Sequence, residues 1–325
     1  MQNSPTPLLA APVVNEVPVW RRLLTAVMVA VLMVLVGAAA CAEQQEKKVT
    51  REWLRANSPT LRGKTRIRIG VREDLPYIGY RNEKGEPAGF DIEIAKALAK
   101  ELGFDNEIDW KSSKDLPDRL SAVERGEVDI AIANISMTEE RKEQVLFVGP
   151  YLVIPLAMMV RSDEADQLNS INDIKSERMQ VCTTTGSAAE KTLRAKDLDE
   201  DLELVTFNTN DECMKWIEKR KSRAFVNDLH VLTGLREKSA KKDELAILDF
   251  AIGDAEERIG IAVPGNDELL RDLLLSYLDE WQRKSEGSPW LKAYDSTLGQ
   301  LKLIDGKYRS QPRVNAPQLA TKAPR

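Results

Sequence analysis

Histidine and cysteine are scarce in this chain. Its 325 residues include one histidine and three cysteines, and their spacing matches no metal-ligand pattern, so we expect neither a metal nor a cofactor. No Ser-His-Asp set is recognisable around the single His230, and we therefore predict that the protein is not an enzyme. Positive charge is not in excess either. The formal net charge is −5, which predicts no basic face for nucleic acid.

The one long hydrophobic run lies near the N-terminus. Residues 1–22 end in two arginines, residues 23–36 are apolar except for Thr25, and small residues then lead to Cys41. This order predicts a secretory signal, and it predicts a lipoprotein whose lipidated N-terminus is Cys41. An uncleaved anchor is the alternative, because the apolar run counted through Cys41 approaches the ~20 residues of a spanning helix. Both interpretations export the rest of the chain.

Between polar ends, short β-rich runs alternate with amphipathic helices. Residues 42–64 predict a flexible tether, and residues 301–325 predict a partly disordered tail. The alternation predicts an α/β fold, and because it begins twice we expect two lobes. The expected strands are 66–71, 108–110, 128–133, 179–183, 202–207, 223–226 and 257–263, and the expected helices are 91–102, 116–124, 187–194, 211–219, 229–238, 267–284 and 290–294.

Polar residues follow several of these strands. Arg141 comes shortly after the strand 128–133, at the kind of strand end where α/β sheets bind ligands. A guanidinium fork matches a carboxylate with two hydrogen bonds, although a surface arginine paired with Glu139 or Glu143 is the alternative. Asp228 stands between a strand and a helix. It is therefore a candidate anion for a ligand, or a simple helix N-cap.

A hydroxyl-rich turn follows the strand that ends near Cys182. The run Thr183-Thr184-Thr185-Gly186-Ser187 opens a helix, and backbone N–H groups at a helix N-terminus favour an anion. Ordinary capping of the helix by Ser187 is the alternative interpretation.

Two motifs carry a resemblance to a known family. The run Gly89-Phe90-Asp91-Ile92-Glu93-Ile94-Ala95, taken with Thr138-Glu139-Glu140-Arg141, resembles the polar amino-acid subfamily of the bacterial extracellular solute-binding proteins, family 3. These proteins are the ligand-catching subunits of ABC importers. The resemblance covers roughly residues 65 to 300 and implies a two-lobed, periplasmic-binding-protein-like type II fold, the Venus flytrap.

The resemblance also implies how the two lobes are assembled. The chain crosses between them twice, near Tyr151–Leu156 and near Phe250–Glu256. Lobe 1 is then residues 65–153 plus 256–300, and lobe 2 is residues 154–255.

A set of ligand contacts comes with the resemblance. Arg141 and Ser136 bind the α-carboxylate of the amino acid, while Asp228 and the carbonyl group of Asn134 bind its ammonium group. Lobe 2 adds contacts from the hydroxyl-rich turn, and the aromatic ring of Tyr77 lies against the aliphatic part of the ligand. In that turn the positions carried over are Thr184 and Ser187.

The selective contact is Arg72, which in glutamate-binding relatives pairs with the side-chain carboxylate. Arg119 adds a second positive charge. Asp74, between Arg72 and Tyr77, is the ninth predicted ligand contact. A receptor for basic amino acids needs extra carboxylates near the aromatic, and Glu73 and Asp74 stand there, so that alternative stays open. The resemblance favours a disulfide between Cys182 and Cys213, with two buried thiols as the alternative.

The predicted function is therefore the extracellular, lipid-anchored receptor of an ABC importer, a monomer that binds glutamate, aspartate or glutamine. The lobes close over the ligand, and the closed form docks on a membrane permease. An amino-acid sensor with the same clamshell is the first alternative, and a dehydratase-like enzyme is the second.

Overall fold

The computed structural model describes residues 49–112, 116–176, 178–195, 202–253, 256–284, 286–303 and 307–319. They belong to one compact unit. Cys41 and the predicted signal segment lie outside the described residues. None of the described helices is both long and apolar enough to span a membrane.

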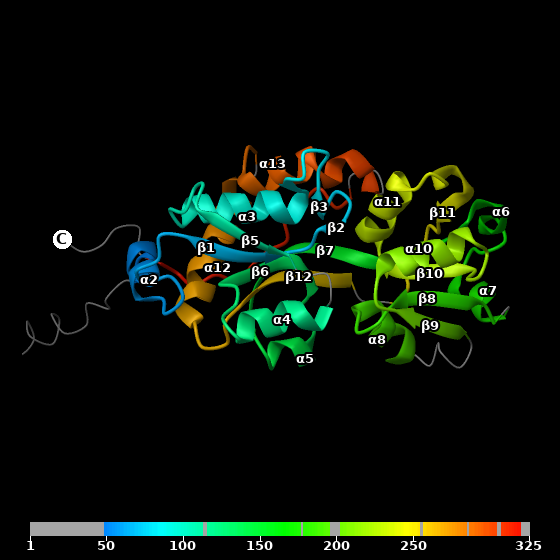
Figure 1. Cartoon of the computed structure of the whole chain (residues 1–325), viewed down its shortest axis with the longest axis horizontal. Coiled ribbons are helices and arrows are strands. Elements are labelled where there is room, and N and C mark those ends of the chain that lie inside the picture. Colours follow the sequence, from blue (N-terminus) through cyan, green and yellow to red (C-terminus); the bar gives the residue numbers. More distant parts are fainter. Residues whose placement is uncertain are drawn as a thin grey trace, which may run out of the picture. The chain divides into compact units, whose positions relative to one another are not determined.

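A large mixed sheet runs through this unit in the order β5-β1-β6-β12-β7-β10-β8-β9, with β11 paired to β7 (Figure 1). Its strands are β1 (Ile67–Val71), β5 (Ile108–Ser112), β6 (Ile130–Ser136), β7 (Leu146–Arg161), β8 (Gln180–Thr184), β9 (Glu203–Phe207), β10 (Ala224–Asp228), β11 (Leu245–Ile247) and β12 (Glu256–Val263). A small antiparallel sheet contains β2 (Asp74–Leu75), β3 (Gly79–Arg81) and β4 (Pro87–Ala88).

Helices cover both faces of the sheet, with α3 and α13 on one side of the first lobe and α4 and α5 on the other (Figure 1). The helices are α2 (Arg51–Asn57), α3 (Phe90–Glu101), α4 (Leu116–Glu124), α5 (Glu139–Lys142), α6 (Ser162–Ala165), α7 (Ile171–Ser176), α8 (Ala188–Ala195), α10 (Asn210–Glu218), α11 (Leu229–Lys238), α12 (Glu268–Lys284), α13 (Pro289–Ser296), and the 3₁₀ turns η1 (Lys242–Glu244) and η2 (Leu298–Leu301).

Strand β7 joins the two lobes. Its first part pairs with β12 as far as the Pro155–Glu256 pair, and its last part pairs with β10 and β11, from Leu156 to Arg161. The sequence analysis did not predict β7, because Gly149, Pro150 and Pro155 interrupt its apolar run and such residues usually end a strand. The predicted residue boundaries of the lobes remain a prediction.

The glycine before α3 is required by the backbone. Gly89 has φ +114°, and a Cβ atom on it would lie 2.5 Å from the carbonyl group of Ile78. Only glycine fits this conformation and this close approach. The turn starts α3 where its apolar face meets the sheet, and it places Asp91 in the first helical turn.

An aromatic cluster attaches the C-terminal helix α13 to the first lobe. Trp290 lies edge-on to Phe90, with ring centroids 5.8 Å apart, and stacks on Tyr294 at 5.2 Å. Its indole N–H donates to the carbonyl of Tyr151 on β7, at 2.6 Å. Such aromatic pairs stabilise a core beyond the area that they bury. The last helices of the chain therefore return to the first lobe.

The predicted flexible tether is wrong for residues 49–64. Helix α2 begins after Thr50, whose side chain accepts a hydrogen bond from the Trp53 N–H, and Leu54 is buried in the core. The segment is also fixed at its end, because buried Asp267 accepts from the Ser58 hydroxyl at 2.6 Å and from the Thr60 N–H at 2.9 Å. These contacts could not be predicted from the polar composition, because a seven-residue helix is too short to show a recognisable apolar periodicity.

The predicted disorder of the tail also does not hold for residues 307–319. Tyr308 is buried, and Arg309 bonds both carboxylate oxygens of Asp295 at 2.7 Å. Gln311 donates to the carbonyl of Leu278 in α12, at 2.7 Å. The low apolar content of this segment indicated disorder, but these polar contacts and Leu319 pack it against the first lobe.

The predicted disulfide is wrong in this structure. Cys182 in β8 and Cys213 in α10 are both buried free thiols. Burial, together with the neighbouring Cys182 thiol, raises the pKa of Cys213 well above its ordinary value. A thiol in such surroundings stays protonated. The two cysteines therefore fill the core of the second lobe, as the alternative interpretation stated.

We expect Leu54→Ala to lower the free energy of unfolding by about 2–4 kcal/mol, because a buried leucine leaves a cavity. Urea unfolding followed by circular dichroism measures this change. The matched control is the neighbouring residue of the same helix, Trp53→Phe, whose exposed side chain predicts a change within about 0.5 kcal/mol. Equal stability of Leu54→Ala and the parent protein would show that α2 is not part of the folded unit.

Candidate functional site

Seven of the nine predicted ligand contacts lie around one cavity between the lobes. These seven are Arg72, Asn134, Ser136, Arg141, Thr184, Ser187 and Asp228. They come from β6, β8 and β10, from the short segments that follow these strands, and from the position after β1. The free volume is about 30 Å³, room for a few water molecules rather than an amino acid. The lobes must therefore separate for a ligand of that size to enter.

Arg141 is a buried cation at the centre of this cavity, with 7% of the residue exposed. Its guanidinium donates to the carbonyl of Ser136 at 3.0 Å and, across the cavity, to the carbonyl of Gly186 at 3.1 Å. No ion pair between Arg141 and a carboxylate is found in the described part of the chain. Burial lowers its pKa, against the opposing effects of Glu257 and Asp228.

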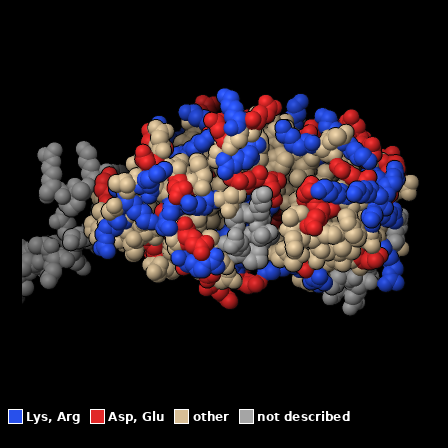
Figure 2. Space-filling view, viewed as in Figure 1, with Lys and Arg blue, Asp and Glu red and all other residues tan. Residues whose placement is uncertain are grey.

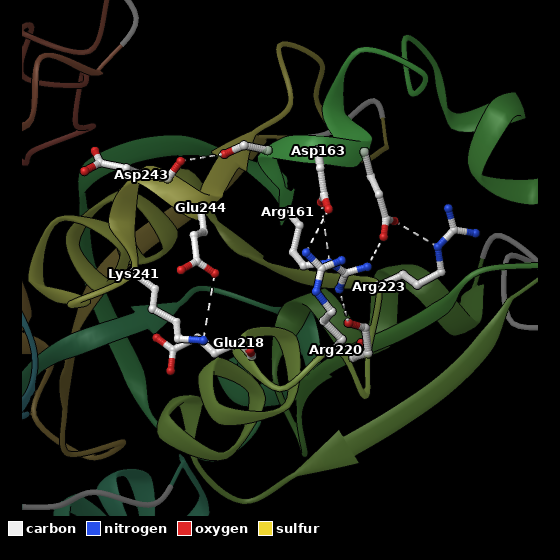
Figure 3. A network of polar contacts seen from close by, with 11 residues as sticks. Arg161, Asp163, Glu218, Arg220, Arg223, Lys241, Asp243 and Glu244 are labelled. Carbon is white, nitrogen blue, oxygen red and sulfur yellow. Dashed lines mark hydrogen bonds and ion pairs between the residues drawn. The ribbon is translucent and has the colours of Figure 1, made fainter.

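Arg161 shows how the same chain accommodates an arginine with a structural role. This residue ends β7 and is also largely buried, but it forms ion pairs with Asp163 and Glu164. Asp163 also binds Arg220 at 2.8 Å, and Glu164 binds Arg223 at 2.9 Å (Figure 3). Carboxylates thus compensate the buried charge in this network, whereas Arg141 has only carbonyl groups.

Arg119 is a second buried cation beside the cavity, and the sequence analysis gave it only a minor place. It is 2% exposed, donates to the carbonyl of Ala133 at 2.9 Å, and has no partner for its Nε atom. Burial lowers its pKa well below the ordinary value, and the positive charges of Arg72 and Arg141 lower it further. Like Arg141, it forms no ion pair among the described residues.

Asp228 is the one carboxylate in the cavity lining. It occupies the N-cap position of α11, yet its side chain makes no capping hydrogen bond, so the simple N-cap interpretation fails. One oxygen instead accepts from the side-chain amide of Asn134 at 2.9 Å. Burial, and then the neighbouring charge of Glu257, raises the pKa of Asp228 to about 7.

Asn134 connects the two lobes through a polar chain that ends at His230. Its amide group donates to Asp228, so its side-chain oxygen faces His230 Nε2 at 2.7 Å. His230 must therefore carry its proton on Nε2. Burial lowers the pKa of His230 to about 3. The histidine is neutral and positions Asn134, which sits in the left-handed region with φ +50°.

Asp91 supports this unusual backbone from the first lobe. Its carboxylate accepts from the Asn134 N–H at 2.8 Å and from the Tyr151 hydroxyl at 2.7 Å. Burial raises the pKa of Asp91 to about 6, although both hydrogen bonds lower it. The residue was quoted for the helix motif but not predicted as a site residue. An acidic residue at the start of an otherwise apolar helix face was the available signal.

The hydroxyl-rich turn faces the cavity, but its groups already have partners. Ser187 accepts from the Glu190 N–H at 3.0 Å and so caps α8, as the alternative interpretation stated. The N–H of Gly186 donates to the Glu190 carboxylate at 2.6 Å. This N–H group was predicted to bind an anion of the ligand, but it already donates to a glutamate of the helix that follows it. Thr184 and Ser187 still line the cavity.

Tyr77 and Asp74 do not line the cavity in the described structure. Asp74 instead forms a two-point ion pair with Arg72, with Nε to Oδ1 at 2.6 Å. The ring of Tyr77 packs against the core and has the Lys238 ammonium 5.5 Å from its centroid. The family resemblance suggested the ligand contact of Tyr77, and Asp74 stands close to it in the sequence. Their role as contacts remains a prediction.

Asn227 and Asn210 also line the cavity and were not predicted. The amide of Asn227 donates to the side-chain oxygen of Asn210 at 2.8 Å, while its oxygen accepts from the Asp228 N–H at 2.8 Å. Asn227 therefore fixes the backbone that carries the site carboxylate. Its position next to Asp228 was the only signal in the sequence.

The fold and this site define a class of ligand-binding protein, and comparisons with known proteins agree. The family model described as "Bacterial extracellular solute-binding proteins, family 3" matches residues 67–309. The glutamine-binding protein of Geobacillus stearothermophilus is 30% identical over 74% of this chain and 94% of its own length. The glutamate-binding protein GluB of Corynebacterium efficiens is 25% identical over 66% of this chain and 73% of its length.

Solved structures give the same result. The cysteine-binding protein of Campylobacter jejuni is 26% identical, with a TM-score of 0.63 over 73% of this chain and 90% of that one. An ancestral arginine-binding protein bound to glutamine is 28% identical, with a TM-score of 0.63 over 73% and 99%. The chain belongs to the bacterial extracellular solute-binding proteins, family 3. The predicted two-lobed type II fold is confirmed.

We expect Asp228→Asn to stabilise the protein above neutral pH. The folded state raises the pKa of Asp228 from 3.8 to about 7, so its favourable contribution is present below pH ~4 and is lost as pH rises through 7. Removing the buried charge predicts a gain of about 1–3 kcal/mol at pH 8. Unfolding at pH 8 and pH 4 measures it, and a variant less stable at both values would contradict the assignment.

Proposed function

We propose that this protein is the amino-acid receptor of an ABC importer and that its ligand is glutamate or aspartate. The observation that carries the proposal is the presence of two buried guanidinium groups, Arg141 and Arg119, without an ion-paired carboxylate in the described residues. Buried charges normally have partners. A ligand with two carboxylates supplies an anionic partner for each of the two guanidinium groups.

The contacts at the amino-acid end follow from the present hydrogen bonds. Arg141 now donates across the cavity to the Gly186 carbonyl, and a charged α-carboxylate is a stronger acceptor for the same fork. Asp228 now accepts from the Asn134 amide. The ligand ammonium group replaces that neutral donor with a charged one.

The charge of the lining favours an acidic side chain. Three arginines and one aspartate line the cavity, and only Arg72 has an ion-paired carboxylate of its own, Asp74. Glutamine or cysteine, named for two of the relatives, leaves Arg119 uncompensated. An arginine ligand adds another cation to this set. Glutamate or aspartate compensates the positive charges of the lining best. In this arrangement Arg119 lies next to the side-chain carboxylate of the ligand, and Asp74 holds Arg72 in place.

The same proposal places the receptor outside the cell as a monomer on the outer face of the membrane. The family is extracellular, and the sequence before residue 42 has the order of a lipoprotein signal ending at Cys41. A lipid on Cys41 keeps the receptor at the membrane, where the closed form docks on the permease. One solved structure, 27% identical with a TM-score of 0.61, is described as an ancestral amino acid-binding protein and a precursor of cyclohexadienyl dehydratase, which keeps turnover as an outcome to test.

We expect isothermal titration calorimetry of the protein without residues 1–41 to show one-to-one binding of glutamate or aspartate among the twenty amino acids. Arg141→Ala weakens binding at least ~100-fold, because it leaves a buried carboxylate unpaired. Arg119→Gln reduces the preference for glutamate over glutamine by roughly tenfold or more. The control, Arg81→Ala, removes an exposed arginine on β3 and leaves affinity unchanged.

Three results of this titration would contradict parts of the proposal. Unchanged affinity in Arg141→Ala would show that this cavity is not the ligand-binding site. Glutamine or arginine as the tightest ligand keeps the clamp but overturns the selectivity. Heat that continues after saturation indicates turnover, and therefore an enzyme.

We expect the affinity to fall as the pH falls through neutrality. The pKa of Asp228 is raised to about 7 by burial, and only the charged carboxylate pairs with an ammonium group. Titrations at pH 8 and pH 6 should differ by roughly tenfold, since one proton must leave on binding. In Asp228→Asn the affinity is weak at both pH values, and a dependence that survives this substitution must come from another group.

A further inference from the structure

Trp53 is the one large apolar side chain that stands exposed among the described residues, at 45%. Helix α2 fixes it in this position. Leu54 packs into the core, Arg51 donates to the Ser276 hydroxyl at 2.8 Å, and Arg55 donates to the Leu102 carbonyl at 2.6 Å. A tryptophan held rigidly at the surface, with an apolar body and a polar N–H, suits a membrane–water interface.

The segment around α2 is strongly basic in a chain that is acidic overall. Residues 47–66 contain seven Lys or Arg and one acidic residue, Glu52, which gives +6 against −11 for the rest of the chain. Arg62 and Arg66 are exposed, and the pair of Arg66 with Glu107 is solvated on both sides, so it holds Arg66 only weakly. Lys and Arg side chains are visible on this end of the molecule in Figure 2.

The position of α2 in the chain points to a particular partner. The helix precedes the region that the family model matches, residues 67–309. Trp53 follows Cys41 by twelve positions in the sequence, and an extended chain of this length reaches about 40 Å at most. If Cys41 or the apolar run before it is held in a bilayer, α2 stays within that distance of the lipid surface.

We propose that the exposed face of α2 around Trp53, with Arg62 and Arg66 in the turn that follows, is a docking surface for an anionic phospholipid bilayer. The indole enters the headgroup layer and the guanidinium groups meet lipid phosphates. Basic residues near an anionic surface contribute about 1 kcal/mol each. The surface is then a second attachment signal, which matters because one acyl chain binds a membrane only marginally. The inference rests on the membrane attachment in the proposed function.

The test uses the full chain as bacteria process it, reconstituted in vesicles that contain phosphatidylglycerol with or without brominated lipid. Flotation measures attachment, and calorimetry with glutamate measures the receptor function separately. The fluorescence of Trp53 is obtained as parent protein minus Trp53→Phe. We expect brominated lipid to reduce this difference signal by roughly twofold or more, because bromine quenches only at contact in the interface layer.

Two further variants test whether the quenching is specific to Trp53 and whether it depends on the basic residues. Trp216→Phe is the matched control, since Trp216 lies edge-on to Phe207 in the second lobe, and its difference signal is not quenched. The double variant Arg62→Glu and Arg66→Glu keeps the exposed tryptophan but reverses the charge, and it should lose most of the quenching of Trp53.

Each remaining outcome overturns the inference. An unquenched Trp53 signal in protein that floats means that α2 faces water or a protein partner, with attachment intact. Parent protein that does not float removes the membrane attachment of the proposed function, and the docking surface that rests on it fails as well. Glutamate binding in the same sample stays independent of both results.

Discussion

The guanidinium of Arg141 lies between two lobes, almost out of contact with water, and only carbonyl groups meet it in the described structure. Moving a cation to such a place costs several kcal/mol unless an anion accompanies it. The surroundings reduce this cost only in part, through the more distant charges of Glu257 and Asp228. The rest of the site is arranged around this uncompensated charge, because the end of β6 and the turn after β8 supply the carbonyl groups of Ser136 and Gly186, and β10 ends at Asp228, whose charge acts on the arginine.

Two of the contacts that now join the lobes are ones that a ligand would replace. Arg141 reaches Gly186, and Asn134 reaches Asp228, while Lys191 and Glu140 form an exposed ion pair outside the cavity. Neutral amide and carbonyl partners give modest net stability. These two contacts with neutral partners therefore hold the closed state only weakly, and a zwitterionic ligand would make closure more favourable by replacing neutral partners with charged ones.

Much of the fold could be predicted from the sequence because the helices and most strands have clear apolar periodicity. Helix α11 has the predicted bounds, and β12 and α12 differ by one residue at one end. Strand β7 could not be predicted, since its glycine and prolines are tolerated by partners distant in the sequence: Gly149 and Pro150 lie where the pairing with β12 shifts register, and Pro155 lies where the pairing passes from β12 to β10. Helix α2 and the packed tail depend on partners more than 200 and about 30 residues away, which local patterns do not encode.

The site was predicted more unevenly, for a related reason. Residues at or shortly after the end of a strand, such as Asp228 and Arg141, are placed by the sheet, so position in the sequence was sufficient. Arg119 lies on α4 and reaches the cavity only because that helix packs beneath β6. Asp74 satisfied the positional argument, but its carboxylate is bound to Arg72. Charge pairing is a property of the folded chain. Here it distinguishes Arg72, which Asp74 already neutralises, from Arg119 and Arg141, which have no carboxylate partner in the described residues.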